Sequence, residues 1–322
     1  MSLFKAQGNV KVMTSHSVRC FLIFLLLAFG VGRGLAENGP EYRDVVLTAN
    51  LQFENRGAEA VLEQIVRLTL PADIPNQQQV LRIKLPAKGN FQWRSHPNQV
   101  DRYIEGKIVL PPNSTTPLQV QTTVRLLPFD YRVNKGNSSR DGNSNFLRPT
   151  SYIESTATEV IGLAARVSAQ YSKDEDRLLA AFRYPQETLE YRKDIGNQGA
   201  LFGLRNGYGD CTEYAAIFIA TARAMGFPAR LTSEFNFENN EAYDQPNHHA
   251  AEVFLNGQWI PVDPNLAIVR NSAYGFGTAG THKVVLKRDG SWVWSSSTRG
   301  VSKNYHQNFI KATLQWSFKQ SP

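Results

Sequence analysis

The stretch GDCTEYAAIFIATARAMG, from Gly209 to Gly226, decides the fold of this chain. Its apolar residues occupy nearly the whole circumference of a helix, which predicts a helix that is buried on all sides. Asp210 and Glu213 have the spacing of an Asp-x-x-Glu capping box. We therefore expect Asp210 at the N-cap and Cys211 at the first helical position.

A cysteine at the start of a helix has two properties that suit a nucleophile. The free N–H groups of the first turn and the positive end of the helix dipole favour its thiolate form. The same N–H groups can receive the oxyanion of a tetrahedral intermediate. The alternative for Cys211 is a small buried side chain with a packing role only, and composition alone does not decide between the two.

The first 36 residues predict a secretory signal peptide. Lys5 and Lys11 belong to a basic start, CFLIFLLLAFGVG follows at 20–32, and small residues end at Ala36. We expect cleavage near Ala36 and a secreted or periplasmic protein. A retained membrane anchor is the alternative, but this apolar run is short against the roughly 20 residues that a span needs. No later segment is apolar and long enough to span a bilayer.

Removal of this segment changes two totals that bear on function. It holds four basic residues and no acidic one, so the net charge falls from +7 to +3. No basic stripe interleaved with aromatic residues is left, and nucleic acid is therefore not expected as a partner. Of the two cysteines only Cys211 remains. In an oxidising compartment a lone thiol is either buried and inert or kept for its reactivity.

Residues 37–133 are expected to form a β-sandwich domain. The run VVLTANLQF at 45–53 alternates apolar and polar side chains, as a strand with one buried face does. Four similar runs follow, each ended by proline or a polar cluster: VLEQIVRLTLP, QVLRIKLP, YIEGKIVLPP and LQVQTTVRLLPF. The domain shows no cluster of potential catalytic side chains, so we expect a packing or recognition role.

The polar segment 134–149 is expected to be a linker, and residues 150–322 a second domain. Apolar residues recur at helical spacing in TATEVIGLAARVSAQY and DEDRLLAAFRY. In AEVFLNGQWIPVDP, the pair Asn256-Gly257 is a strong signal for a hairpin of two strands. Further strands are expected in two later segments: SWVW at 291–294 and FIKATLQWSF at 309–318.

A thiolate nucleophile needs a base, and few histidines are available. His248 and His249 stand just before the predicted hairpin, and Asp263 closes its second strand. Because a hairpin places its two ends side by side, a histidine at one end can meet the aspartate at the other. Neighbouring residues of a regular strand point to opposite faces, so the two histidines cannot both reach Cys211 or bind one metal. Surface histidines without a chemical role are the alternative.

Three blocks in this order resemble the transglutaminase-like domain of the papain-type cysteine enzymes: GDC at the start of the predicted helix, GFPAR after its end, and HHAAEVFLNGQWIPVDP. The resemblance is close over residues 209–264 and weaker back to about Tyr152. It implies an α+β fold, in which an N-terminal β-sandwich precedes a papain-like core with the nucleophile helix packed on an antiparallel sheet. Many members have a tryptophan where this chain has Ala250, which leaves one wall of the cleft smaller.

The resemblance also implies the roles of three residues. Cys211 takes the place of the nucleophile, His248 that of the base four residues before the family's glutamate, and Asp263 that of the orienting acid. No organic cofactor and no metal are implied. A side-chain oxyanion donor cannot be assigned, and Tyr208 and Gln198 are the two candidates.

The implied activity is acyl transfer from amide bonds of a protein or peptide substrate through a thioester. Hydrolysis, as a protease or amidase, is expected over crosslinking to an amine, because an exported protein meets water at high concentration. The alternative is a non-catalytic module that binds peptides or cell-wall components with an idle triad. The polar segment 235–249 is expected to be a loop over the cleft that carries specificity, with a solvated turn as the alternative.

Overall fold

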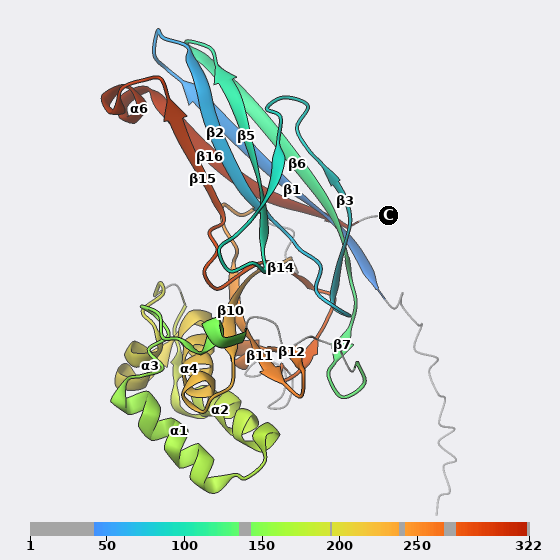
Figure 1. Ribbon diagram of the computed structural model, residues 1–322, viewed down its shortest axis with the longest axis vertical. Helices are drawn as coiled ribbons and strands as arrows, with labels where there is room; N and C mark the ends of the chain where they lie inside the picture. Colours follow the sequence, from blue (N-terminus) through green and yellow to red (C-terminus); the bar gives the residue numbers. More distant parts are fainter. Residues whose placement is uncertain (1–41, 135–142, 194, 238–241, 267–274, 321–322) are drawn as a thin grey trace, which may run out of the picture. The chain divides into compact units, whose positions relative to one another are not determined.

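The computed structural model describes residues 42–134, 143–193, 195–237, 242–266 and 275–320. The predicted signal peptide and half of the predicted linker, residues 135–142, lie outside these residues. Residues 40–322 form one compact unit, which Figure 1 shows. Among its described helices, none has the length and apolar character that crossing a bilayer requires.

Two four-stranded antiparallel sheets form the β-sandwich (Figure 1). The first has the order β16 (Ile310–Gln320), β1 (Arg43–Asn55), β6 (Ser114–Leu126) and β3 (Gln78–Lys84). The second has the order β15 (Trp294–Arg299), β2 (Val61–Leu70), β5 (Arg102–Leu110) and β4 (Gln92–Ser95). Alternate residues of β1 from Val45 to Phe53 are buried, as the alternation of the sequence predicted.

The last two strands correct the predicted assignment of residues 150–322 to a single second domain. Strand β16 pairs with β1 along its whole length, and β15 pairs with β2. Both strands thus complete sheets that the N-terminal half begins. The alternation of a strand shows which face is buried but not which strand it pairs with, so the sequence did not reveal this return. The strand predicted at 291–294 also begins later, at Trp294.

The second half of the chain builds a sheet covered by helices. The sheet has the order β12 (Gln258–Val262), β11 (His248–Leu255), β10 (Ala229–Asn236) and β14 (Lys283–Arg288). The helices are α1 (Thr158–Gln170), α2 (Asp174–Thr188), α3 (Ala200–Asn206) and α4 (Cys211–Ala224). Helix α4 packs on β10 and β11 and contacts the other three helices, which lie around it in Figure 1.

Short elements connect these parts. They are β7 (Phe129–Asp130), η1 (Asn143–Leu147), β8 (Glu190–Tyr191), β9 (Tyr208–Gly209), β13 (Thr278–Ala279) and α6 (Lys303–Phe309). Strand β7 pairs with β13, and β8 pairs with β9 in parallel. The β8–β9 pair leads the chain directly into α4.

The core sheet is buried on both faces. Every residue of α4 from Thr212 to Arg223 is buried, as the apolar circumference predicted. One hydrophobic cluster surrounds this helix, and a second fills the sandwich. Strands β10 and β14 add Phe235 and Leu286 to the second cluster. The strands that carry the candidate site are therefore fixed by packing on either side.

Candidate active site

Cys211 is the first residue of α4, and its position is set by a complete capping box. The Asp210 side chain accepts from the Thr212 N–H at 2.9 Å. Glu213 Oε2 in turn accepts from the Asp210 N–H at 3.0 Å, so both halves of the predicted box are present. Cys211 is a free and partly exposed thiol. The capping residues thus fix the turn on which the thiol is presented.

Glu213 also ties a preceding loop to the start of the helix. Its Oε1 accepts from the backbone N–H groups of Gln198 at 2.8 Å and Gly199 at 3.3 Å. The side chain is fully buried, and this burial raises the pKa of Glu213. A Cβ on Gly209 would lie 2.5 Å from the Cβ of Glu213, so only glycine fits the approach to the nucleophile. The sequence identified the cap but not this link to the loop.

The hairpin that carries the histidine and the acid is present as predicted. Strand β11 pairs with β12 from Leu255↔Gln258 to Ala251↔Val262. Asn256 and Gly257 connect them with φ values of 50° and 81°, the left-handed conformations that a tight hairpin turn needs. His248 therefore stands at the open end of the hairpin beside Asp263, the residue after β12.

His248 and Asp263 form a short, buried pair. His248 Nε2 lies 2.8 Å from Asp263 Oδ2, and the Leu266 N–H donates to the other carboxylate oxygen at 3.0 Å. Burial alone would lower the pKa of His248, but the charge and hydrogen bond of Asp263 raise it well above its ordinary value. Burial alone would raise the pKa of Asp263, but the charges of His248 and Lys283 hold it well below its ordinary range.

The Cys211 side chain lies close enough to the same imidazole to add to the rise in the pKa of His248. The three residues that the sequence singled out thus lie in one line of contacts, from the acid through the imidazole to the sulfur. A proton can pass between sulfur and ring while the carboxylate stabilises the imidazolium.

His249 points away from this line, as the alternation of strand residues predicted. Its Nδ1 lies 3.1 Å from the Ser233 hydroxyl on β10. Burial and the nearby Lys287 ammonium lower the pKa of His249 to about 4. The ring is therefore neutral at pH 7, and it is not a second base for Cys211.

The lowered pKa of His249 predicts a pH dependence of stability. In the unfolded chain His249 takes up its proton near pH 6.5, but in the folded chain only near pH 4. Between these values the unfolded chain binds more protons, so stability falls as the pH drops from about 6.5 to about 4. We expect urea unfolding of His249→Gln to depend less on pH in this window than that of the wild type. Equal dependence in both proteins contradicts the assignment.

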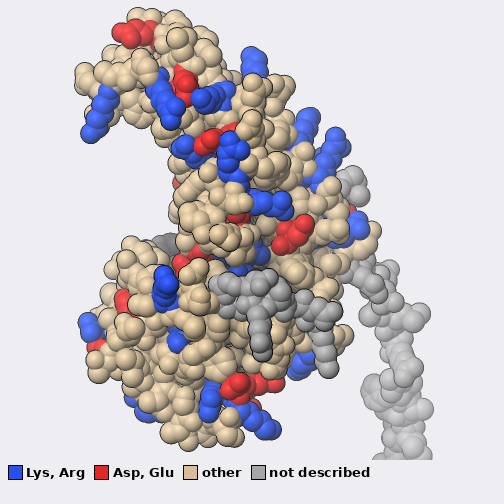
Figure 2. Space-filling model, viewed as in Figure 1, with Lys and Arg blue, Asp and Glu red and all other residues tan. Residues whose placement is uncertain are grey.

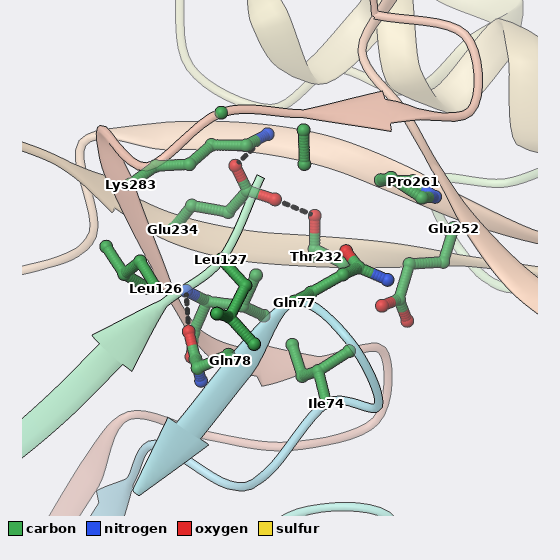
Figure 3. A pocket seen from close by; sticks show the side chains of 13 residues that line it. Ile74, Gln77, Gln78, Leu126, Leu127, Thr232, Glu234, Glu252, Pro261 and Lys283 are labelled. Carbon is green, nitrogen blue, oxygen red and sulfur yellow. Dashed lines mark hydrogen bonds and ion pairs between the residues drawn. The ribbon is translucent and has the colours of Figure 1, made fainter. Parts of the chain in front are cut away.

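Two charged residues that the sequence did not flag lie behind the acid. Lys283, the first residue of β14, places Nζ 2.6 Å from Glu234 Oε2 and 3.4 Å from Asp263 Oδ2. Figure 3 shows the Lys283–Glu234 pair and the hydrogen bond from the Thr232 hydroxyl to Glu234. No spacing in the sequence marks these residues, because they meet only when β10 and β14 pair.

The same region brings together side chains of types that can bind a metal ion. Among the described residues, potential ligand atoms of Glu234, His248 and Asp263 all lie within 4.8 Å of one another. However, the Lys283 ammonium contacts both carboxylates and already supplies the positive charge between them. A divalent cation would face that ammonium at contact distance, at a large electrostatic cost. The donor set therefore does not fit a metal ion.

The oxyanion donor and the specificity loop are not assigned by the geometry. The Gln198 amide donates to the Ile195 carbonyl at 3.3 Å. The Tyr208 ring packs against Phe202, and the guanidinium of Arg192 lies 4.0 Å from its centroid. Part of the predicted loop over the cleft, residues 238–241, lies outside the described residues. In the described part, Tyr243 forms a backbone bridge with Trp316 on β16, with Tyr243 N 2.9 Å from Trp316 O. This bridge anchors the segment to the sandwich. Its role in specificity stays a prediction.

Part of the chain matches a known protein family. Residues 161–264 match the sequence model of the Transglutaminase-like superfamily. The match includes residues 209–264, on which the predicted resemblance to a transglutaminase-like domain rested, and this resemblance is confirmed. No curated protein matches the chain.

The fold is similar to that of a candidate cysteine protease from Cytophaga hutchinsonii. The two chains share 17% identity over 87% of this chain and 91% of the other, with a TM-score of 0.57. This similarity confirms the predicted α+β architecture. The periplasmic domain of TgpA from Pseudomonas aeruginosa, bound to ethylmercury, shares 15% identity over 68% of this chain and 89% of its own, with a TM-score of 0.33. That value is too low to bear on the fold.

Proposed function

We propose that this protein is an acyl-transfer enzyme that opens amide bonds of proteins or peptides through a thioester on Cys211. The observation that supports this most directly is the line of contacts from Asp263 through His248 to Cys211 at the start of α4. Each of these positions suits one step of the chemistry: nucleophile, proton carrier and stabiliser of the carried charge.

In the proposed mechanism, His248 takes the proton of Sγ, and the thiolate attacks the carbonyl carbon of the amide. The carbonyl electron pair moves to oxygen, where the first N–H groups of α4 donate to it. When the carbonyl re-forms, the C–N bond breaks, and His248 gives its proton to the departing ammonia or amine. Water, deprotonated by His248, then attacks the thioester. The products are a carboxylic acid and the regenerated Cys211 thiol.

Hydrolysis is proposed over crosslinking because the thiol is partly exposed, so that water can reach a thioester formed on it. The test is a reaction of the mature protein with casein and glutamine-containing peptides in H₂¹⁸O, with and without a dansylated primary amine. Incorporation of ¹⁸O into a new carboxylate supports hydrolysis. Transfer of the dansyl amine supports crosslinking instead. Peptide binding without any product, equal in wild type and Cys211→Ala, would indicate the non-catalytic module.

We further propose that the protein acts outside the cytoplasm, on the grounds of the basic and apolar pattern of residues 1–36. Intact mass of the protein purified from cell fractions tests this. A chain that begins near Glu37 in the exported fraction supports export and cleavage. A full-length chain in the cytoplasm contradicts it.

A further inference from the structure

The acid of the candidate triad does not stand alone. Asp263 Oδ2, the oxygen that meets His248 Nε2 at 2.8 Å, also lies 3.4 Å from Lys283 Nζ. The same ammonium lies 2.6 Å from Glu234. The side chains of Lys283, Glu234 and Asp263 are only 8%, 3% and 4% exposed, so bulk water screens none of them effectively.

Both carboxylates are fixed in place by separate elements. Glu234 is directly opposite His248 in the pairing of β10 with β11, and its Oε1 accepts from the Thr232 hydroxyl at 2.7 Å. Asp263 is held at the end of the hairpin by the Leu266 N–H. Figure 3 shows Lys283 reaching Glu234 from β14, beside a cavity of ≈ 20 Å³. The arrangement is thus two buried acids, one ammonium and one imidazole.

Without the ammonium, two like charges would share this site at a high cost. Neighbouring buried carboxylates avoid that cost by binding a proton, which raises the pKa of one of them strongly. A proton shared with Glu234 would take negative charge away from Asp263 Oδ2, where the imidazole needs it. An ammonium between the two acids removes the reason for that proton to bind.

We infer that Lys283 and Glu234 are positioning residues of the triad: Lys283 keeps Asp263 ionised and aimed at His248, and Glu234 balances Lys283 so that its charge does not oppose the imidazolium. The inference rests on the proposed function, because it concerns the same site. Neither residue is assigned a contact with substrate or sulfur. Their effect passes through Asp263 to His248.

The sign of each substitution follows from the charge on Asp263 Oδ2, the atom that meets His248, and from any cation left unbalanced beside it. In Lys283→Met, the two acids share a proton, Asp263 attracts the imidazolium less, and His248 loses its proton at a lower pH. In Glu234→Gln, the unbalanced ammonium repels the imidazolium, and His248 again loses its proton at a lower pH. In the double variant, Asp263 carries one full negative charge, which equals the net charge of Asp263, Lys283 and Glu234 together. The midpoint of the His248 titration therefore returns toward its original value.

The experiment is a titration of His248 by NMR in the full chain carrying Cys211→Ala, with the resonance assigned by its loss in His248→Gln. The Cys211 replacement removes the thiol. Among the described residues, the titratable and charged groups left near the ring are then Asp263, Glu234 and Lys283, with His249 next to it in sequence but pointing the other way. We expect each single variant to lower the midpoint by about one pH unit or more, the size of shift that a charge at this distance causes. The double variant is expected to recover most of that shift.

A matched control on the same strand is Lys287→Met, which removes a cation near His249 instead of Asp263. It is expected to leave the His248 midpoint in place. An unchanged or raised midpoint in Lys283→Met, in a protein with a native amide spectrum, overturns the inference. If Lys283→Met does not fold, the Glu234→Gln titration decides alone, and an unchanged midpoint there overturns the inference as well.

This titration needs neither substrate nor thiol. If the proposed function is wrong, the wild-type protein gives no product in the activity test. The His248 midpoints still show whether Lys283 acts on the imidazole. Conversely, if the wild-type protein is an active enzyme but the His248 midpoint is unchanged in both variants, the inference is contradicted and the proposed function is not.

Discussion

Replacement of Cys211 by alanine is expected to remove turnover, with a loss of at least about 10³-fold on any substrate that the wild-type protein opens. In the proposed mechanism the thioester forms on the sulfur of Cys211, and no other residue of the described site offers a nucleophile beside His248. The loss is measured as kcat/KM with the peptide that the wild type hydrolyses best. Thermal unfolding of the variant is expected to stay close to that of the wild type, because the thiol is partly exposed.

The two histidines provide the control for this prediction. His248→Ala is expected to lose about as much activity as Cys211→Ala, because residues that act as a unit are not additive. His249→Ala is expected to keep most of the activity, since its ring faces Ser233 instead of the thiol. Retained turnover in Cys211→Ala, or equal losses in both histidine variants, would contradict the assigned roles.

Removal of the Asp101 carboxylate is expected to cost about 3–5 kcal/mol of folding stability, the usual cost of breaking a buried ion pair from one side. Asp101 is completely buried on the sandwich side, and its Oδ1 accepts from Arg288 Nη1 at 2.8 Å. Its Oδ2 accepts from the Arg288 backbone N–H at 2.7 Å. In Asp101→Ala the guanidinium of Arg288 stays buried beside Glu252, a carboxylate that it shares with Arg230. Urea unfolding measures the loss.

Two comparisons make this prediction specific. The double variant Asp101→Ala with Arg288→Met removes both charges and is expected to recover part of the lost stability. The surface pair of Arg125 and Asp44, joined at 2.8 Å but with side chains 32% and 20% exposed, is the matched control. Asp44→Ala is expected to cost at most about 1 kcal/mol. Similar costs for Asp101→Ala and Asp44→Ala would contradict the role given to burial.

The local features of the site could be predicted because each depends on residues close in sequence. The capping box depends on Asp210 and Glu213 alone, three positions apart. The hairpin depends on Asn256-Gly257 and the alternation on either side, and its closure brings His248 to Asp263. Choosing His248 over His249 needed the spacing that the family resemblance supplied, and the structure places that ring, not the other, against the acid.

The remaining features depend on pairings between distant segments, which a sequence pattern does not specify. Strands β15 and β16 look like any other strands, yet they complete sheets begun by β2 and β1. Lys283 meets Asp263 only because β14 pairs with the edge of β10 that faces away from β11. Glu213 was expected as a cap, but its second oxygen binds a loop fourteen and fifteen positions earlier. In each case the local pattern was correct and the partner was set by the tertiary fold.

The central claim is that Cys211 and His248 form an activated pair, and alkylation of the thiol tests it most directly. In a chain that begins at Glu37, Cys211 is the one cysteine, so every iodoacetamide adduct reports on it. We predict that the thiol is alkylated at pH 7 much faster than the free thiol of a small peptide, because the thiolate is the reactive form and His248 favours it. We also predict that this rate falls in His248→Ala but not in His249→Ala. Slow labelling that His248→Ala leaves unchanged would contradict the claim and make Cys211 a structural cysteine.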